Sequence, residues 1–239
     1  MYKKASDSKN EKLSIIVFGE PNAGKTSLAR TIKEKAVIID AEGGLQSIND
    51  LDTPTFRLYE DSKGQPIPRH KRYDRLLKFK QYLTTDEGRK DGFKWIVIDS
   101  LTEVSQNMLE QVKHEEQVKK DSGEKINSFE KWTNYKERME SLIKDIRDLK
   151  GYNILALALV DETRNEDGSK DKTVDIEGKI SQRIPAIFDE VLYLHRDNEG
   201  KRVLVTDNYK NIICKDRSGK LNQFEPADID LISKKIKGK

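Results

Sequence analysis

The segment GEPNAGKTS, residues 19–27, has residue types and spacing that suit the binding of a phosphate chain. It fits the pattern G-x-x-x-x-G-K-[ST] between an apolar run and a segment of helical composition, which is the context expected of a P-loop. Glycines let backbone N–H groups close around phosphate oxygens, and the N-terminus of the following helix adds positive charge. The alternative is an ordinary glycine-rich turn that caps a helix.

Two side chains of this loop have roles of their own. Lys25 is expected to reach the β- and γ-phosphates, and the Thr26 hydroxyl is expected to bind Mg²⁺. A second metal anchor is usually an Asp that ends an apolar strand, and WIVIDS supplies Asp99, which can also cap the next helix. ATP and Mg²⁺ are the expected ligands. The predicted nucleotide-binding residues are Gly19, Glu20, Pro21, Asn22, Ala23, Gly24, Lys25, Thr26 and Ser27.

The catalytic base does not directly follow the metal anchor in the sequence. A Glu at position 100 would stand beside Asp99, but the sequence has Ser100 there. The stretch IIDAEGG, residues 38–44, ends a second apolar run with Asp40 and Glu42. Either carboxylate could cap N–H groups of the turn. Glu42 is also the candidate for the group that activates the attacking water.

These motifs resemble the RecA family of recombination ATPases. The resemblance implies that Glu42 polarises the attacking water and that Asp40 supports it. Near the C-terminus, residues 215–219 (KDRSG) are similar to the K-x-R-x-G signature of bacterial RadA and to the Lys/Arg finger of ring helicases. By that likeness, Lys215 and Arg217 reach the γ-phosphate held by a neighbouring subunit. The alternative is a basic turn at a strand end.

The layout from Leu13 to Pro226 most resembles small phage-encoded RecA-like proteins that are grouped with single-strand annealing recombinases. This implies an ATP-dependent recombinase or annealing protein that binds single-stranded DNA as a ring or filament, with a single-strand-binding protein as a further partner. Two features depart from RecA. Residues 1–12 are too short for its oligomerisation segment, and the fourth strand ends in Asp161-Glu162 instead of Gln or His. A DNA-coating scaffold that uses ATP for assembly and a helicase-type motor or regulator are the alternatives.

The same resemblance places DNA contacts in two loops, at 119–128 and 162–178. Contact with phosphates is electrostatic and needs no base-specific groups. The second loop carries about as many acids as bases, however, so a solvated face is an equal alternative. The basic segment 69–80 and the C-terminal lysines are rival patches. The candidate phosphate contacts of the second loop are Arg164, Lys170, Lys172 and Lys179.

The elements that must position these residues follow from the apolar pattern. Continuous apolar runs predict buried strands, and these alternate with segments of helical period, which indicates a parallel sheet covered on both faces. We therefore predict an α/β, RecA-like P-loop core with an antiparallel C-terminal edge. Strands are predicted at 13–19, 36–40, 55–59, 93–100 and 153–160, helices at 25–35, 69–83, 102–119 and 129–149, a loop at 160–178, and short strands at 189–196, 201–207 and 211–216.

Composition narrows the class of protein further. Forty-five Lys and Arg against 42 Asp and Glu leave a charge of +3, which does not by itself indicate a nucleic-acid-binding protein. A single cysteine, Cys214, excludes an internal disulfide and fits a reducing compartment. No run approaches 18 apolar residues, and the first twelve residues lack a signal-peptide core, so we expect a cytoplasmic protein without membrane contact, in a bacterial host if phage-encoded. The expected organisation is a flexible arm (1–12), an ATPase domain (13–228) and a basic tail (229–239).

Overall fold

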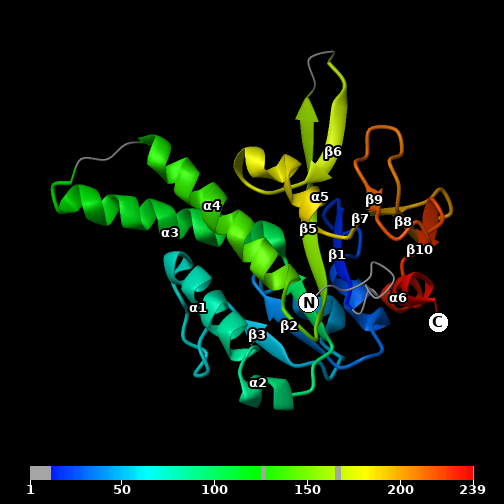
Figure 1. The fold of residues 1–239 in the computed structure, drawn as a ribbon, viewed down its shortest axis with the longest axis horizontal. Coiled ribbons are helices and arrows are strands. Elements are labelled where there is room, and N and C mark those ends of the chain that lie inside the picture. Colours follow the sequence, from blue (N-terminus) through cyan, green and yellow to red (C-terminus); the bar gives the residue numbers. More distant parts are fainter. Residues whose placement is uncertain (1–11, 125–127, 165–167, 239) are drawn as a thin grey trace, which may run out of the picture.

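The computed structural model describes residues 12–124, 128–164 and 168–238. Within these residues one sheet runs in the order β10-β8-β7-β1-β5-β4-β2-β3, with β6 beside β5 and β9 beside β7 (Figure 1). The strands are β1 (Ser14–Gly19), β2 (Ala36–Asp40), β3 (Thr55–Arg57), β4 (Trp95–Asp99), β5 (Asn153–Arg164), β6 (Lys170–Val174), β7 (Glu190–Arg196), β8 (Arg202–Val205), β9 (Lys215–Asp216) and β10 (Phe224–Pro226). The α-helices are α1 (Arg69–Tyr82), α2 (Asp86–Lys90), α3 (Leu101–Asp121), α4 (Ser128–Arg147), α5 (Ile184–Ile187) and α6 (Ile229–Lys237), and the 3₁₀ helices are η2 (Thr26–Thr31), η3 (Leu45–Ile48) and η4 (Gly178–Gln182).

The central strands of the sheet run parallel. Strand β1 pairs with β5 and β7, β4 pairs with β5 and β2, and β2 pairs with β3, all in parallel. Antiparallel pairing joins β8 and β9 to β7, β10 to β8, and β6 to β5. The predicted fold class is confirmed: a mostly parallel sheet is flanked by helices and ends in antiparallel strands.

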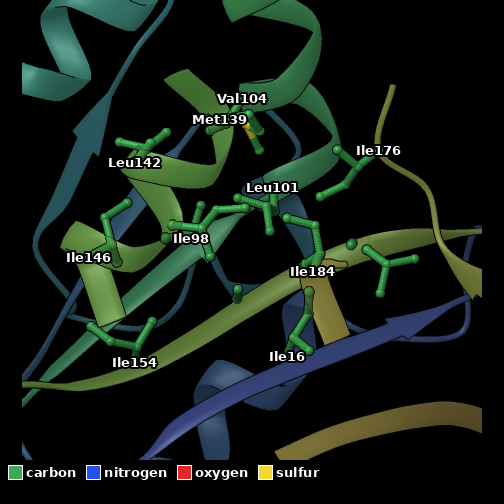
Figure 2. Close-up of a cluster of buried hydrophobic side chains, with 14 of the residues drawn as sticks. Ile16, Ile98, Leu101, Val104, Met139, Leu142, Ile146, Ile154, Ile176 and Ile184 are labelled. Carbon is green, nitrogen blue, oxygen red and sulfur yellow. The ribbon is translucent and has the colours of Figure 1, made fainter. Parts of the chain in front are cut away.

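Both faces of the sheet are buried, which explains the continuous apolar runs of the sequence. Alternate residues of one strand enter different cores, as Ile16 and Phe18 of β1 do on one face and Ile15 and Val17 on the other. Helices α1, α3, α4 and α5 cover the first face, where Met139 of α4 packs among the residues of Figure 2. Helices η2, η3 and α6 cover the second face. The strands are therefore fixed from both sides, and their carboxyl ends can hold a site.

The segment after the P-loop differs from the helix predicted over 25–35, because it forms only the six-residue 3₁₀ helix η2. Thr31 contributes to this early end. Its hydroxyl donates to the backbone oxygen of Leu28 at 2.7 Å and accepts from the backbone N–H of Ile229 at 2.9 Å. Side chains that bond to the backbone in this way compete with regular helix bonds.

The predicted loop at 160–178 was wrong for most of its length. Strand β5 continues to Arg164 and returns as β6, giving a hairpin that rises from the carboxyl edge of the sheet (Figure 1). The segment has few apolar residues because the hairpin is held by its backbone ladder and by ion pairs such as Lys170 with Glu162 at 2.8 Å. Residues 165–167 and the side chain of Lys179 lie outside the description, as do 125–127 of the other predicted DNA loop.

The aromatic stripe of α4 was predicted to pack in the core, and this holds only from Tyr135 onward. Phe129 is 81% exposed and Trp132 is 46% exposed. Both lie in the first turns of α4, where α3 and α4 run side by side beyond the sheet (Figure 1). The apolar residues do recur with a helical period, but only the part of α4 that packs against the sheet buries them.

The segment 229–239, expected as a basic tail, forms helix α6 over most of its described residues. Ile229, Ile232 and Ile236 are buried on the second face of the sheet. Lys235 of this helix forms an ion pair with the buried Glu225 at 2.7 Å. Residues 1–11 of the expected arm lie outside the described part. Among the described residues, no helix combines the length and apolar composition that crossing a membrane requires.

Candidate active site

The loop between β1 and η2 is tight, and two of its residues adopt positive φ angles. Gly19 ends β1 at a point where a Cβ would lie 2.5 Å from the backbone oxygen of Leu194 on β7. Asn22 and Gly24 have φ angles of 61° and 101°, which Asn and Gly adopt more readily than other residues. The predicted P-loop is thus present as a tight loop at the carboxyl end of β1.

Lys25 is held by this loop. Its Nζ donates to the backbone oxygens of Gly19 and Glu20, both at 2.9 Å. Burial lowers the pKa of Lys25, while the nearby carboxylates of Glu42 and Asp99 act in the opposite direction. The ammonium group therefore stands at the loop, close to the two acids that the sequence assigned to catalysis and to the metal.

Thr26 and Asp99 meet as predicted for two metal anchors. The Thr26 hydroxyl donates to Oδ2 of Asp99 at 2.7 Å. Burial raises the pKa of Asp99 to about 6, against the opposing effect of the Thr26 bond. No group of three or more His, Cys, Asp or Glu residues that could hold a metal occurs in the described ranges. Because Mg²⁺ usually takes one or two protein ligands and completes its shell with phosphate and water, this oxygen pair fits an ion that binds with a nucleotide.

Asp40 caps the turn after β2. It lies beside Asp99 in the parallel register of β2 and β4. Its Oδ1 accepts from the backbone N–H of Gly43 at 2.7 Å, and its Oδ2 accepts from the Tyr59 hydroxyl at 3.0 Å. Burial and the Asp40 carboxylate raise the pKa of Tyr59 to about 12, so the phenol remains a donor. Asp40 therefore caps the turn, as the capping alternative expected, and in doing so it supports the turn that carries Glu42.

Glu42 has a different set of contacts. Its side chain is exposed, and its Oε1 accepts a hydrogen bond from the Ser100 hydroxyl. Ser100 is joined to Asp99 through a cis peptide bond, and its Oγ also accepts from the backbone N–H of Glu103 at the start of α3, at 3.3 Å. The carboxylate therefore lies next to Asp99, the candidate metal ligand, and remains open to solvent. That is the position required of a group that activates water.

Comparison with known families agrees with this geometry. A family model described as an AAA domain matches residues 11–218. The chain belongs to this AAA domain family. No curated protein matches its sequence. Membership supports a P-loop NTPase with nucleotide-dependent activity, consistent at this level with an ATPase that binds its nucleotide together with Mg²⁺.

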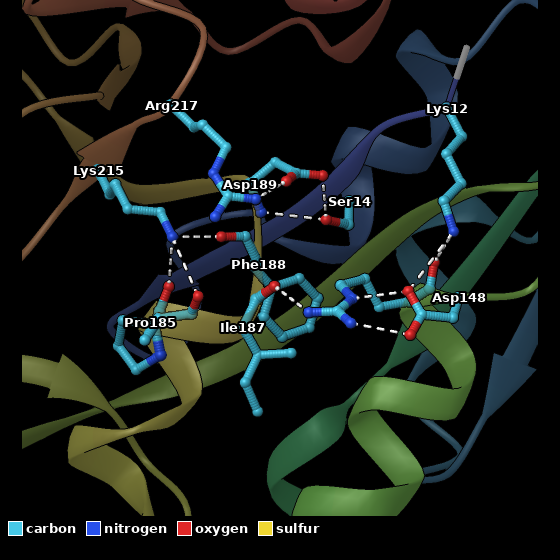
Figure 3. A network of polar contacts seen from close by, with 11 residues as sticks. Lys12, Ser14, Asp148, Pro185, Ile187, Phe188, Asp189, Lys215 and Arg217 are labelled. Carbon is cyan, nitrogen blue, oxygen red and sulfur yellow. Dashed lines mark hydrogen bonds and ion pairs between the residues drawn. The ribbon is translucent and has the colours of Figure 1, made fainter. Parts of the chain in front are cut away.

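The predicted finger residues of this AAA domain lie at the opposite edge of the sheet from its P-loop. Figure 3 shows the polar contacts that Lys215 and Arg217 make there. Strand β9 pairs with the first residues of β7, which lie beside the start of β1. Arg217 forms an ion pair with Asp189 at 2.7 Å, and Asp189 accepts from the Ser14 hydroxyl at 2.6 Å. Because β1 spans about 17 Å between its ends, Arg217 cannot reach the P-loop of its own chain.

Lys215 is engaged within the AAA domain. Its Nζ donates to the backbone oxygens of Pro185, at 2.9 Å, and of Phe188. Burial and the neighbouring Arg217 lower the pKa of Lys215. The role of Lys215 and Arg217 in a neighbouring subunit's site stays a prediction.

Two cations near the P-loop were not assigned to it from sequence. Lys172 of β6, predicted as a DNA contact, forms an ion pair with Glu20 at 2.8 Å. Arg202 of β8 lies against Gly24. No local signal marks either residue, because each is brought to the loop by strand pairing over more than 150 residues.

Proposed function

We propose that this AAA domain hydrolyses ATP to ADP and phosphate with Mg²⁺. The observation that supports hydrolysis best is the different partner of each carboxylate. Asp99 is bound to the P-loop hydroxyl of Thr26, Asp40 is bound to its own turn, and Glu42 is left at Ser100 with an exposed carboxylate. This difference supports Asp99 as the metal ligand and Glu42 as the group that activates water.

The chemistry follows from these positions. A water molecule attacks the γ-phosphorus, gives its proton to Glu42, and the bond to the ADP oxygen breaks. Lys25 stabilises negative charge on the β- and γ-phosphates, and the Ser100 hydroxyl orients the base. A positioned general base contributes about 10²–10⁴-fold to a rate.

Glu42→Gln tests the proposal. It should lower steady-state ATP turnover by about 10²–10⁴-fold and leave nucleotide affinity near that of the wild type, because only the proton acceptor is lost. Glu60→Gln is the matched control, since Glu60 is paired with Arg57 on the same side of the sheet. Hydrolysis at the wild-type rate by Glu42→Gln would show that this carboxylate is not the base.

We further propose that the active form is an oligomer with ATP sites shared between subunits. Support comes from the position of Arg217, which is 59% exposed and too far from its own P-loop to serve it. An arginine supplied in trans stabilises charge in the transition state. Arg217→Ala should then retain ATP binding and lose hydrolysis. A mixture of Arg217→Ala with Glu42→Gln should regain activity, because some interfaces pair an intact base with an intact finger. Co-assembly without rescue would count against shared sites.

Single-stranded DNA is the proposed partner, in the manner of the phage-encoded annealing and recombinase group. Support comes from the β5–β6 hairpin, which carries Arg164, Lys170 and Lys172 and joins the P-loop through the Lys172–Glu20 pair. ATPase rates with and without single-stranded DNA test this link. Stimulation supports a DNA-coupled recombinase. Tight DNA binding with negligible turnover supports the scaffold, and strand displacement supports the motor.

A further inference from the structure

The hairpin of β7 and β8 brings an arginine to the P-loop. Strand β7 runs parallel to β1, and its Leu194 oxygen comes so close to Gly19 that a side chain there would collide with it. Strand β8 returns antiparallel to β7, with Arg202 opposite Arg196 near the turn. The close backbone contact between Leu194 and Gly19 fixes the position of the β7–β8 hairpin. The pairing of the sheet therefore brings Arg202 to the loop.

The guanidinium of Arg202 occupies space that a glycine leaves open. Its Cζ and Nε lie 2.6 Å, and its Nη1 lies 3.0 Å, from the place where a Cβ on Gly24 would be. Gly24 immediately precedes Lys25, so the arginine lies on the part of the loop whose backbone N–H groups face the ligand in a P-loop.

Arg202 has no anionic partner in the described part of the chain. Neither a hydrogen bond nor an ion pair of its guanidinium occurs among residues 12–124, 128–164 and 168–238. Neighbouring cations differ in this respect. Lys172 is paired with Glu20, Arg30 with Asp50, and Lys201 with Glu199. A planar guanidinium with five N–H donors is suited to bind phosphate oxygens through two bonds at once.

We propose that Arg202 binds, within its own chain, the phosphates that ADP and ATP share. The side of the P-loop on which Arg202 lies indicates which phosphates it binds. Strands β7 and β8 lie on one side of β1, whereas Asp99 and Glu42 are carried by strands β4 and β2 on the other side, beyond β5. Those two acids mark the side of the metal and the attacking water. Arg202 therefore acts on nucleotide affinity and not on the chemical step.

This inference rests on the proposed nucleotide-binding function and deepens it. The test is calorimetric binding of Mg-ADP and of a non-hydrolysable Mg-ATP analogue to the full chain. Arg202→Ala and Arg202→Gln should weaken both ligands alike, by roughly 10- to 100-fold, the usual effect of one charge-assisted contact. Arg202→Lys should lose less, because it keeps the charge without the two-pronged geometry. In turnover assays KM should rise while kcat stays within about twofold.

Lys201→Ala is the matched control, since it removes the same charge from the adjacent residue, whose side chain is paired with Glu199. It should bind both nucleotides as the wild type does. Thermal unfolding of the free variants should match the wild type. Wild-type ADP affinity in Arg202→Ala and Arg202→Gln would overturn the inference while leaving the proposed function intact. A loss confined to the ATP analogue would overturn it by placing Arg202 at the terminal phosphate. A wild-type chain that binds neither nucleotide would overturn both.

Discussion

Lys25 and Lys215 make similar contacts at opposite edges of the sheet, but different charges surround them. Each ammonium group donates to backbone oxygens, and burial lowers the pKa of each. Lys25 binds the carbonyls of a loop that faces the ligand site, with Glu42 and Asp99 nearby. Lys215 binds carbonyls at the end of α5, with the cation Arg217 nearby.

The two sets of carbonyls have different needs. The last carbonyls of a helix have no partner within it and require a donor from elsewhere, which Lys215 supplies to Pro185 and Phe188. The oxygen of Gly19 ends a buried strand and that of Glu20 begins an exposed turn, so neither belongs to the end of a helix. Hydrogen bonds from a lysine to backbone carbonyls therefore do not by themselves identify a ligand-binding residue. The charges beside the ammonium group distinguish the two lysines, since carboxylates lie near Lys25 and a cation lies near Lys215.

The largest effect should come from the carboxyl edge. Lys25→Ala should weaken binding of a non-hydrolysable Mg-ATP analogue by about 10- to 100-fold, because the phosphates lose a charge-assisted donor. The free energy of unfolding of the free protein should change little. Calorimetry and urea unfolding of the same preparation measure both quantities. Wild-type affinity in this variant would remove the distinction drawn between the two lysines.

The opposite result is expected at the amino edge. Lys215→Ala should lower the free energy of unfolding by about 1–3 kcal/mol, because partly buried carbonyls at the end of α5 lose their donor. Affinity for nucleotide should stay near that of the wild type. Urea denaturation measures the first effect, with Lys201→Ala as an exposed control. If Lys215→Ala were fully stable but inactive in hydrolysis, its contacts to α5 would be incidental and its finger role primary.

A pH effect should also distinguish the amino edge. Burial and the neighbouring Asp216 raise the pKa of Glu190 to about 8 from an ordinary value of 4.5. Between these two values the folded protein holds a proton that the unfolded chain has released. Raising the pH through this window should therefore lower the free energy of unfolding, by up to about 1.4 kcal/mol per pH unit.

Glu190→Gln should flatten this dependence, because a neutral amide has no proton to lose. Denaturant melts at pH 6, 7 and 8, as rough sampling points of the same window, measure the slope. Glu199→Gln serves as control, since Glu199 lies on the exposed β7–β8 turn and pairs with Lys201. An unchanged slope in Glu190→Gln would assign the pH dependence to other groups.

The smallest effect concerns two lysines of the hairpin at the carboxyl edge. Lys170 is paired with Glu162 within the hairpin, whereas Lys172 is paired with Glu20 of the P-loop. If both contact DNA, each alanine variant should reduce the salt slope of single-stranded DNA binding by about 0.7. Lys172→Ala should in addition change nucleotide affinity, and Lys170→Ala should not. If both alanine variants kept the wild-type salt slope, the DNA contact would have to lie elsewhere, on α1 or at the C-terminal lysines.

The meeting of the P-loop residues with Asp99 was predictable because the signals for it are local in the sequence. A buried strand produces an apolar run in the sequence, and the residues at or just beyond its carboxyl end enter the site, as Lys25, Thr26 and Asp99 do. The different contacts of Asp40 and Glu42 were not predictable from the turn alone. They depend on Tyr59, which is 19 residues away from Asp40, and on Ser100, which is 58 residues away from Glu42.

The β5–β6 hairpin and Arg202 escaped prediction for another physical reason. Composition signals strands through burial, and the upper part of this hairpin is solvated on both sides, so its charged residues gave no apolar pattern. The contact of Arg202 with Gly24 depends on the register of β8 against β7 and of β7 against β1. Register between strands far apart in the chain leaves no mark in one sequence.

Strand β5 is both a central member of the sheet and one arm of the projecting hairpin. Its twelve residues form one extended strand of about 40 Å. The lower half is clamped between β1 and β4, and the upper half stands free of them (Figure 1). The two halves meet at the carboxyl edge of the sheet, where Leu159 lies opposite Gly19 of the P-loop. Lys172 pairs the hairpin with Glu20 of the P-loop, so we expect a force applied to the hairpin in a single-molecule experiment to reach the loop through this ion pair.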